Sequence, residues 1–214
     1  MRAPSETASE TGPCVTCWDG ISEETLQMAL APPATQCVEA DLIDDCGDDV
    51  VLSQPAPGRL SLIVTTRSAY RHSIVKAFVN AMENRASLSK DLRVRLYSAV
   101  QEALMNAVLH GNLRIDSDLR GNLDGLLAAQ DAIESKLNLP EIARSKIRVE
   151  AIWNASVLNV MIRDSGRGYD HENADECPAS ADRASGRGIA ILQAFSDRVA
   201  VLNGGTTVNL EFQL

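Results

Sequence analysis

One stretch in the middle of the chain, residues 89–111, constrains the fold most, because its polar residues follow a helical spacing. Glu102, Asn106 and His110 stand four residues apart, and four residues advance an α-helix by about 40° beyond one full turn. The three side chains therefore form a narrow stripe. The apolar residues of the same helix fall beside this stripe and not opposite it. Because buried polar groups need partners, the stripe either pairs within itself or lines a site.

Length and charge narrow the class of protein. A chain of 214 residues can bury one good-sized core. It has no apolar run of the roughly 18 to 20 residues that cross a bilayer and no apolar leader, so we expect a cytoplasmic protein without membrane contact. Residues 1–58 hold eleven acids and one base, whereas residues 59–214 hold eighteen acids and nineteen bases. No basic stripe interleaved with aromatic residues is present, so direct nucleic-acid binding is not expected.

The acidic residues 1–58 are predicted to form a partly disordered N-terminal arm. Residues 1–20 are small, polar and acidic, which favours disorder. Residues 22–31 predict a short helix with Ser22 as its N-cap. Residues 34–58 end in a Pro- and Gly-containing segment that is typical of a linker. The arm is either a tail that orders on contact or a regulatory, partner-docking segment.

Four cysteines lie in this arm. Cys14 and Cys17 form a C-x-x-C pair, and Cys37 with Cys46 would complete a four-sulfur metal site. The second pair has a spacing unlike that of zinc ribbons. We therefore favour reduced thiols over a metal site.

Residues 59–214 are predicted to form one folded domain. Strands are expected at 59–66, 146–154, 157–163, 198–202 and 206–212, and helices at 68–85, 89–111, 119–137 and 186–195. This order lacks regular βαβ crossovers and favours an α/β two-layer sandwich, with a mixed, mainly antiparallel sheet and helices on one face. Residues 113–145 form a helical insertion in this plan.

Two glycine-containing motifs have the chemistry of a nucleotide site. Asp164 ends a predicted strand and precedes Gly166 and Gly168, so its carboxylate can accept a hydrogen bond from an exocyclic amine such as that of adenine. The alternative is an ordinary turn aspartate. Gly186 and Gly188 stand at a helix start, where free N–H groups favour phosphate. The alternative there is an ordinary helix cap.

The polar stripe supplies complementary groups. Asn106 can offer its amide oxygen to Mg²⁺, or it is a satisfied core amide. Glu102 can orient or deprotonate an attacking hydroxyl or water, or it is a paired acid at the core edge. His110 satisfies the helix end or forms part of the pocket wall. Thr206 either hydrogen-bonds near the ligand of Asp164 or is a β-branched strand residue.

Taken in order, four motifs resemble the N, G1, G2 and G3 boxes of the Bergerat (GHKL) ATP-binding fold of histidine kinase-like ATPases. They are EALMNAVLHGN, DSGRGYD, SGRGIAILQAFSD and NGGTTVNL. The last two resemble most closely those of the anti-sigma factor serine/threonine kinase branch. The resemblance covers about residues 59–214, while the acidic residues 1–58 and the insertion at 113–145 depart from the family pattern.

The resemblance implies ATP and Mg²⁺ as cofactors and gives each site residue a role. It implies that Asn106 coordinates Mg²⁺ and that Glu102 is the catalytic base or positions water. It also implies an ATP lid over residues 169–185. The implied cofactor-binding residues are Asn106 and His110 on the helix, Asp164, Gly166, Gly168 and Thr206 around the adenine, and Gly186, Arg187 and Gly188 at the phosphates.

The function that this resemblance implies is a regulatory kinase. It would phosphorylate a serine or threonine of an anti-sigma antagonist-type protein, with a sigma factor as a further partner, and it is compatible with a homodimer. A first alternative is a non-catalytic module that binds partners when ATP is bound. A second is the catalytic part of a histidine kinase with His72 as acceptor, although His72 lacks the acidic neighbour and downstream proline of such sites.

Overall fold

The computed structural model describes residues 14–45, 58–115, 123–168 and 185–214. Within them, one seven-stranded sheet has the order β1-β2-β3-β4-β5-β7-β6. The strands are β1 (Val15–Trp18), β2 (Gln36–Glu39), β3 (Arg59–Thr65), β4 (Lys146–Trp153), β5 (Val157–Arg163), β6 (Arg198–Leu202) and β7 (Thr207–Gln213). The first three strands are parallel, and all later pairings are antiparallel. The prediction of a mixed, mainly antiparallel sheet is confirmed.

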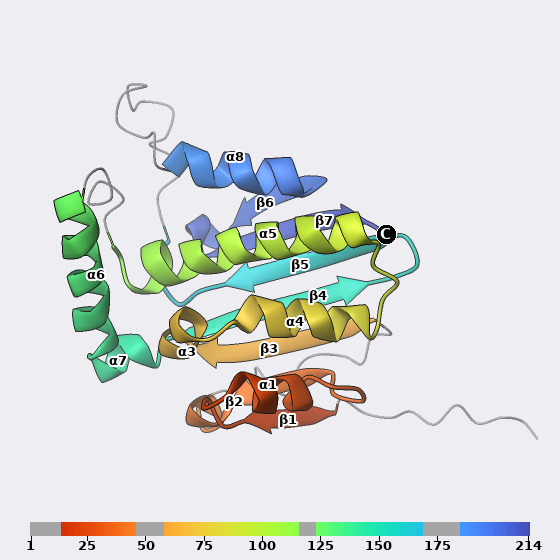
Figure 1. Cartoon of the computed structure of the whole chain (residues 1–214), viewed down its shortest axis with the longest axis horizontal. Helices are drawn as coiled ribbons and strands as arrows, with labels where there is room; N and C mark the ends of the chain where they lie inside the picture. Colours follow the sequence, from red (N-terminus) through yellow and green to blue (C-terminus); the bar gives the residue numbers. More distant parts are fainter. Residues whose placement is uncertain (1–13, 46–57, 116–122, 169–184) are drawn as a thin grey trace, which may run out of the picture.

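The main helices lie side by side over one face of this sheet, as Figure 1 shows for α1, α4, α5 and α8. The helices are α1 (Glu23–Ala29), α3 (Thr66–Arg71), α4 (Ile74–Glu83), α5 (Lys90–Asn106), α6 (Leu123–Leu137), α7 (Pro140–Ala143) and α8 (Ser185–Phe195). A π-helical segment, η2 (Ala107–Asn112), continues α5, and η1 (Ala40–Leu42) is a short 3₁₀ turn. The predicted α/β two-layer sandwich is confirmed.

The core lies between the sheet and these helices. Alternation along the strands explains which strand side chains are buried in it. In β5 the residues Leu158, Val160 and Ile162 are buried, while their neighbours in the strand are more exposed. The predicted start of the central helix is confirmed, since α5 begins at Lys90. The Ser89 side chain accepts the Leu92 N–H at 3.1 Å and so caps this helix. The last turn is π-helical and was not predicted.

The single helix predicted over residues 68–85 is wrong, because the chain leaves the helix between α3 and α4. His72 is extended (φ −111°, ψ 156°), and its ring meets that of Trp18 edge-on, with centroids 5.3 Å apart. Trp18 belongs to β1, so His72 contacts a strand distant in the sequence at the point where the helical pattern is interrupted.

Residues 14–45 differ most from prediction, because they belong to the sheet and are not a separate tail. Trp18, Leu26, Leu30 and Cys37 are buried in the main core. The helix with Ser22 as N-cap is confirmed, since the Ser22 side chain accepts the Thr25 N–H at 3.2 Å. The linker predicted over 34–58 is wrong where β2 and η1 form. The acidic composition favoured a tail, whereas most of these acids lie on the surface of the folded chain.

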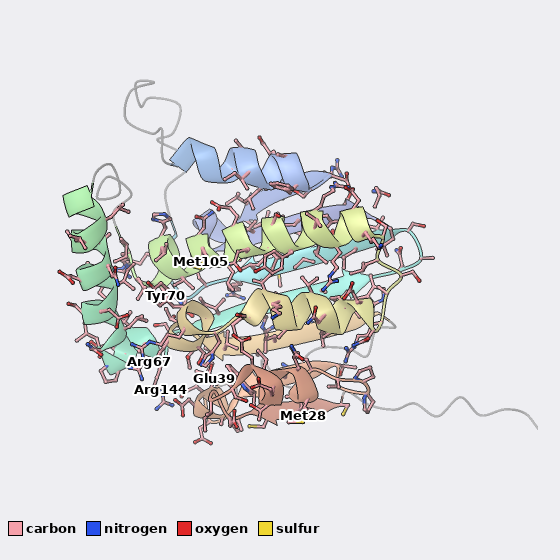
Figure 2. All side chains as sticks on the ribbon, in the orientation of Figure 1. Met28, Glu39, Arg67, Tyr70, Met105 and Arg144 are labelled. Atoms are coloured by element: carbon pink, nitrogen blue, oxygen red, sulfur yellow. The ribbon has the colours of Figure 1, made fainter. Side chains whose placement is uncertain are left out.

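Residues 14–45 form the N-terminal unit, and one of its acids, Glu39 at the end of β2, is buried. Glu39 connects this unit to α3. Its carboxylate accepts the Thr65 N–H at 2.7 Å and the Ser68 hydroxyl at 2.7 Å. The Thr65 hydroxyl also donates to it, at 3.1 Å. Figure 2 labels Glu39 where the N-terminal unit meets α3. A buried carboxylate with three donors stabilises this junction.

The insertion forms α6 and α7 at one end of the sheet (Figure 1). The helix predicted at 119–137 agrees with α6 from Leu123 onward, and residues 119–122 lie outside the described residues. Pro140 opens α7, where its missing N–H costs nothing. Lys136 donates to the carbonyls of Leu113 and Arg114, which connects α6 to the end of η2.

Consecutive strands form two antiparallel hairpins, β4–β5 and β6–β7. Asn154 Oδ1 accepts the N–H groups of Ser156 and Val157 at 2.8 and 2.9 Å in the turn between β4 and β5. A 3₁₀ turn, η5 (Asn203–Gly205), connects β6 and β7.

In the described part of the chain, no helix is long and apolar enough to cross a membrane.

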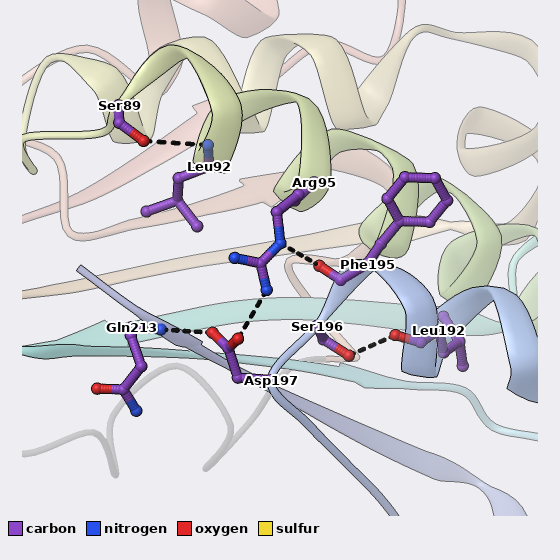
Figure 3. A network of polar contacts seen from close by, with 8 residues as sticks. All are labelled: Ser89, Leu92, Arg95, Leu192, Phe195, Ser196, Asp197 and Gln213. Carbon is purple, nitrogen blue, oxygen red and sulfur yellow. Dashed lines mark hydrogen bonds and ion pairs between the residues drawn. The ribbon is translucent and has the colours of Figure 1, made fainter.

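A polar network holds α8 beside α5 at the end remote from η2 (Figure 3). Arg95 of α5 donates to the Phe195 carbonyl at 3.2 Å and to Asp197 at 2.8 Å. Asp197 also accepts the Gln213 N–H at 2.8 Å, and this bond, followed by Arg95, lowers the pKa of Asp197. The network connects α5, α8 and β7, and so positions the helix that carries Gly188.

Candidate functional site

The polar stripe of α5 pairs partly within itself. Asn106 Nδ2 donates to Glu102 Oε1 at 3.2 Å, and both side chains are half-buried. This bond orients the amide, so that among the described residues Asn106 Oδ1 remains an open acceptor. Asn106 lines the cavity described below, and an amide oxygen is a ligand that Mg²⁺ accepts.

His110 follows one turn later, in η2, where it lines the cavity described below. Its Nδ1 lies 2.9 Å from the Ile115 carbonyl oxygen. The side chain thus both bonds the helix end and forms part of the pocket wall, the two alternatives derived from the sequence. π-helical turns within α-helices often occur at functional sites.

Asp164 lies immediately after β5, at the end of the strand, as predicted. Its Oδ1 accepts the Gly166 N–H at 2.7 Å, and its own N–H donates to the Thr206 carbonyl at 3.1 Å. Burial raises the pKa of this carboxyl above its usual range, although the Gly166 N–H partly opposes the effect. A partly desolvated carboxylate of this kind gains strongly from a donor on a ligand.

The backbone packs closely around Asp164. A Cβ on Gly111 would lie 2.6 Å from the Asp164 carboxyl carbon, and one on Gly166 would lie 2.5 Å from the Gly111 carbonyl oxygen. Gly168 has φ +71°, and a Cβ there would lie 1.8 Å from the Gly204 carbonyl oxygen. The turn after β5 therefore fits against both η2 and the η5 turn only with glycines in these places.

Thr206 contacts this turn through its main chain, by the carbonyl that accepts the Asp164 N–H. Its hydroxyl donates to the Asn203 carbonyl at 3.0 Å, and its side chain is not among those that line the cavity. The role of Thr206 in supporting adenine stays a prediction.

The start of α8 brings Gly188 to the polar stripe. A Cβ at Gly188 would lie 3.0 Å from Glu102 Oε1 and 3.1 Å from Asn106 Nδ2. Gly186 and Arg187 belong to the first turn of α8. The side chain of Arg187 and residues 169–184, most of the predicted lid, lie outside what the structure describes.

These elements enclose a cavity of about 250 Å³. Its polar side chains come from Asn106, His110 and Asp164. Its apolar wall is formed by Ala103, Ala107, Ile162, Leu192, Val201 and Val208, and Gly111, Gly168, Gly188, Ile189 and Gly205 complete the lining. An apolar slot with a carboxylate in its wall suits a flat heterocycle that carries an amino group.

Several of these residues were not singled out from the sequence. The apolar wall was foreseeable in part, because alternation along the strands predicts which side chains face the helices. Gly111 and Asn112 stand in the quoted motif, but the sequence gives no sign that they meet residues near Asp164.

The cysteine predictions are tested only in part. Cys37 is buried, and desolvation raises the pKa of its thiol to about 11, whereas Cys17 is exposed. Among the described residues, no cluster of three or more metal-ligating side chains occurs. Cys46, the fourth member of the four-sulfur hypothesis, lies outside them.

The sheet, the covering helices and the cavity together define a nucleotide-binding α/β sandwich. The sequence profile of the histidine kinase-like ATPase domain matches residues 65–212, and the chain belongs to this ATP-binding family. No curated protein matches the chain in sequence. The matched range begins at the last residue of β3, so β1, α1 and β2 precede it.

Proposed function

We propose that this chain binds ATP with Mg²⁺ and transfers the γ-phosphoryl group to a serine or threonine of a small anti-sigma antagonist-type protein. The observation that carries the proposal is the placing of two polar groups on one apolar cavity. Asp164 supplies a desolvated carboxylate to it, and Asn106 supplies an oriented amide. A sigma factor would be a further partner in a switch of this kind.

Adenine would occupy the apolar slot, with its exocyclic amine donating to Asp164. The hydrogen bond would be charge-assisted in a partly desolvated place, where such bonds contribute about 1.5–3 kcal/mol. Gly166 and Gly168 shape the turn that holds this carboxylate. The triphosphate would extend toward the first turn of α8, where Gly186, Arg187 and Gly188 supply N–H groups and a positive charge.

The residues present fit a magnesium ion. Asn106 Oδ1 is the open acceptor, and the Glu102 carboxylate fixes the amide in that orientation. When bound, Mg²⁺ would neutralise charge on the phosphate oxygens. The ion needs few protein ligands, because phosphates and waters supply the others.

Glu102 would act as the general base. The acceptor hydroxyl would attack the γ-phosphorus while the bond to the β,γ-bridging oxygen breaks and ADP departs. The hydroxyl proton passes to the Glu102 carboxylate, whose Oε2 accepts no hydrogen bond among the described residues.

One observation favours a second candidate, the non-catalytic partner-binding module. Glu102 Oε1 already accepts the Asn106 amide, so Glu102 can serve to position Asn106 without moving a proton. Under this candidate ATP orders the partner surface and is not consumed.

Calorimetry of ATP·Mg²⁺ binding tests the nucleotide site. We expect Mg²⁺-dependent binding to the wild type and at least tenfold weaker binding to Asn106→Ala, since the variant loses the oriented amide oxygen. Equal affinity in the two proteins would contradict the metal assignment. The matched control is Asn159→Ala, a half-buried asparagine of β5 that does not line the cavity.

Transfer of labelled phosphate from ATP to a candidate antagonist distinguishes the two candidate functions. The kinase predicts acid-stable phosphate on a serine or threonine, abolished by Glu102→Gln. Binding of ATP without transfer would favour the non-catalytic module. Acid-labile label on His72 would instead support the histidine kinase.

A further inference from the structure

Asn112, the last residue of η2, is a buried side chain to which the proposed function gives no role. It is 8% exposed. Its Nδ2 donates to the Thr66 hydroxyl at 2.7 Å and to the Lys146 carbonyl at 3.3 Å. Its Oδ1 accepts the Ser165 N–H at 2.9 Å. One amide therefore contacts three segments that are far apart in the sequence.

These three segments meet where the proposed adenine site is built. Thr66 begins α3, Lys146 begins β4, and Ser165 directly follows Asp164. The contacts support one another, because the Ser165 hydroxyl also donates to the Lys146 carbonyl at 3.0 Å. A buried amide with this many satisfied bonds holds its neighbours in one arrangement.

Gly111, the residue before Asn112, lets η2 approach the Asp164 turn closely. Gly111 lies against the Asp164 carboxyl, with no space for a side chain between them. The end of η2 thus contacts both parts of the Asp164 turn: Gly111 packs on the carboxyl group, and Asn112 accepts the next main-chain N–H.

We infer that Asn112 is a positioning residue that fixes the Asp164–Gly166 turn and thereby sets the preference for a purine with an amino group at position 6. The inference rests on the proposed function, in which Asp164 accepts the adenine amine. Asn112 does not line the cavity, so its effect passes through the turn. A displaced carboxylate loses the directional hydrogen bond to the amine but leaves the apolar slot and the phosphate contacts in place.

The test compares the dissociation constants of ATP and inosine triphosphate, which carries a carbonyl oxygen in place of the amine. We expect the wild type to prefer ATP. Asn112→Ala should bind ATP about tenfold more weakly, which corresponds to the loss of one charge-assisted hydrogen bond. Its affinity for inosine triphosphate should stay within about twofold of the wild-type value. General loosening of the site would instead weaken both nucleotides together, and that result would overturn the inference.

A second variant keeps the test decisive if Asn112→Ala fails to fold. Thr66→Val removes the hydroxyl that holds the Asn112 amide and preserves shape, and the Ser145 carbonyl keeps the Thr66 main-chain N–H at 2.9 Å. We expect a smaller loss of ATP preference, of about threefold. Leu30→Ala is the control, because it destabilises the core in the N-terminal unit and should leave the nucleotide preference unchanged.

The failure of the inference is distinguishable from that of the proposed function. A wild type that binds ATP and inosine triphosphate equally, or neither, contradicts the role of Asp164 itself. A wild type that prefers ATP, with the full preference retained in Thr66→Val and in any folded Asn112→Ala, overturns only the role of Asn112.

Discussion

At the scale of single residues, Asp164 shows how a candidate binding site holds a charge at the expense of stability. Its carboxylate is partly desolvated, and within the described residues the Gly166 N–H is the main group that stabilises its charge. A charge held this way costs free energy in the empty protein and interacts strongly with a donor that arrives on a ligand.

We predict that Asp164→Asn weakens ATP binding about 10- to 100-fold, the range for losing a charged hydrogen bond, without lowering the melting temperature. The asparagine oxygen can still accept the Gly166 N–H, and the cost of burying a charge disappears. Calorimetry and thermal unfolding measure the two effects. A variant that loses stability together with affinity would contradict this account.

The raised pKa of Asp164 also fixes the sign of a pH effect. The folded protein keeps the Asp164 proton to a higher pH than the unfolded chain does. In the unfolded chain the pKa of this carboxyl is near 3.8. The contribution of this group to the unfolding free energy therefore decreases as pH rises from there through the folded-state pKa. ATP affinity should change in the opposite direction, falling as the carboxylate takes up its proton, and Asp164→Asn should lose both dependences.

At the scale of elements, the junction between β2 and α3 depends on one carboxylate. Glu39 accepts three hydrogen bonds at the start of α3, two of them from side chains. Because the junction excludes water, a replacement with fewer acceptor sites leaves a donor without a partner.

We predict that Glu39→Gln lowers the free energy of unfolding by about 1–3 kcal/mol, since its NH₂ group faces donors that the carboxylate accepts. Urea unfolding followed by circular dichroism measures this difference. The exposed Glu24→Gln in α1 is the matched control, which should change stability by less than about 0.5 kcal/mol. Equal stability of the two variants would contradict a structural role for Glu39.

The elements also show what the sequence could and could not predict. Glu102, Asn106 and Asp164 could be predicted as candidate site residues because each stands in a local pattern, a helical stripe or a strand end followed by glycines. The contact between Asn112 and Ser165 joins residues far apart in the sequence, so no local pattern contains it. The contact between His72, at the break, and Trp18 likewise joins residues far apart in the sequence.

The N-terminal strands were missed for a different physical reason. β1 and β2 have four residues each, and strands so short are stable only when paired with a formed neighbour. Their flanking acids favoured an interpretation as a tail. The pairing with β3 that stabilises them is a property of the assembled sheet.

At the scale of the whole molecule, the N-terminal unit and the ATPase family core share one hydrophobic core. Trp18, Leu26 and Leu30 are at most 1% exposed and pack into the same cluster as α4 and α5. The boundary of the family profile at residue 65 therefore does not mark a boundary of packing.

We predict that a chain beginning at Gly58 melts roughly 10 °C or more below the full chain, since losing even a few buried large side chains costs several kcal/mol. Differential scanning calorimetry measures the shift. Removal of residues 1–13 alone is the control, because every contact described above is kept, and it should melt with the full chain. A chain from Gly58 that melts at the same temperature would show that the N-terminal unit is dispensable.

The parallel pairing of β2 on β3 also has a consequence for self-association. β3 is a seven-residue strand that contains the run Leu60-Ser-Leu-Ile-Val64, and such an apolar strand at a sheet edge is a template for pairing with other chains and for fibre formation. β2 covers it, and the edge passes to β1, which has four residues. The N-terminal unit thus also protects the chain against aggregation through β3.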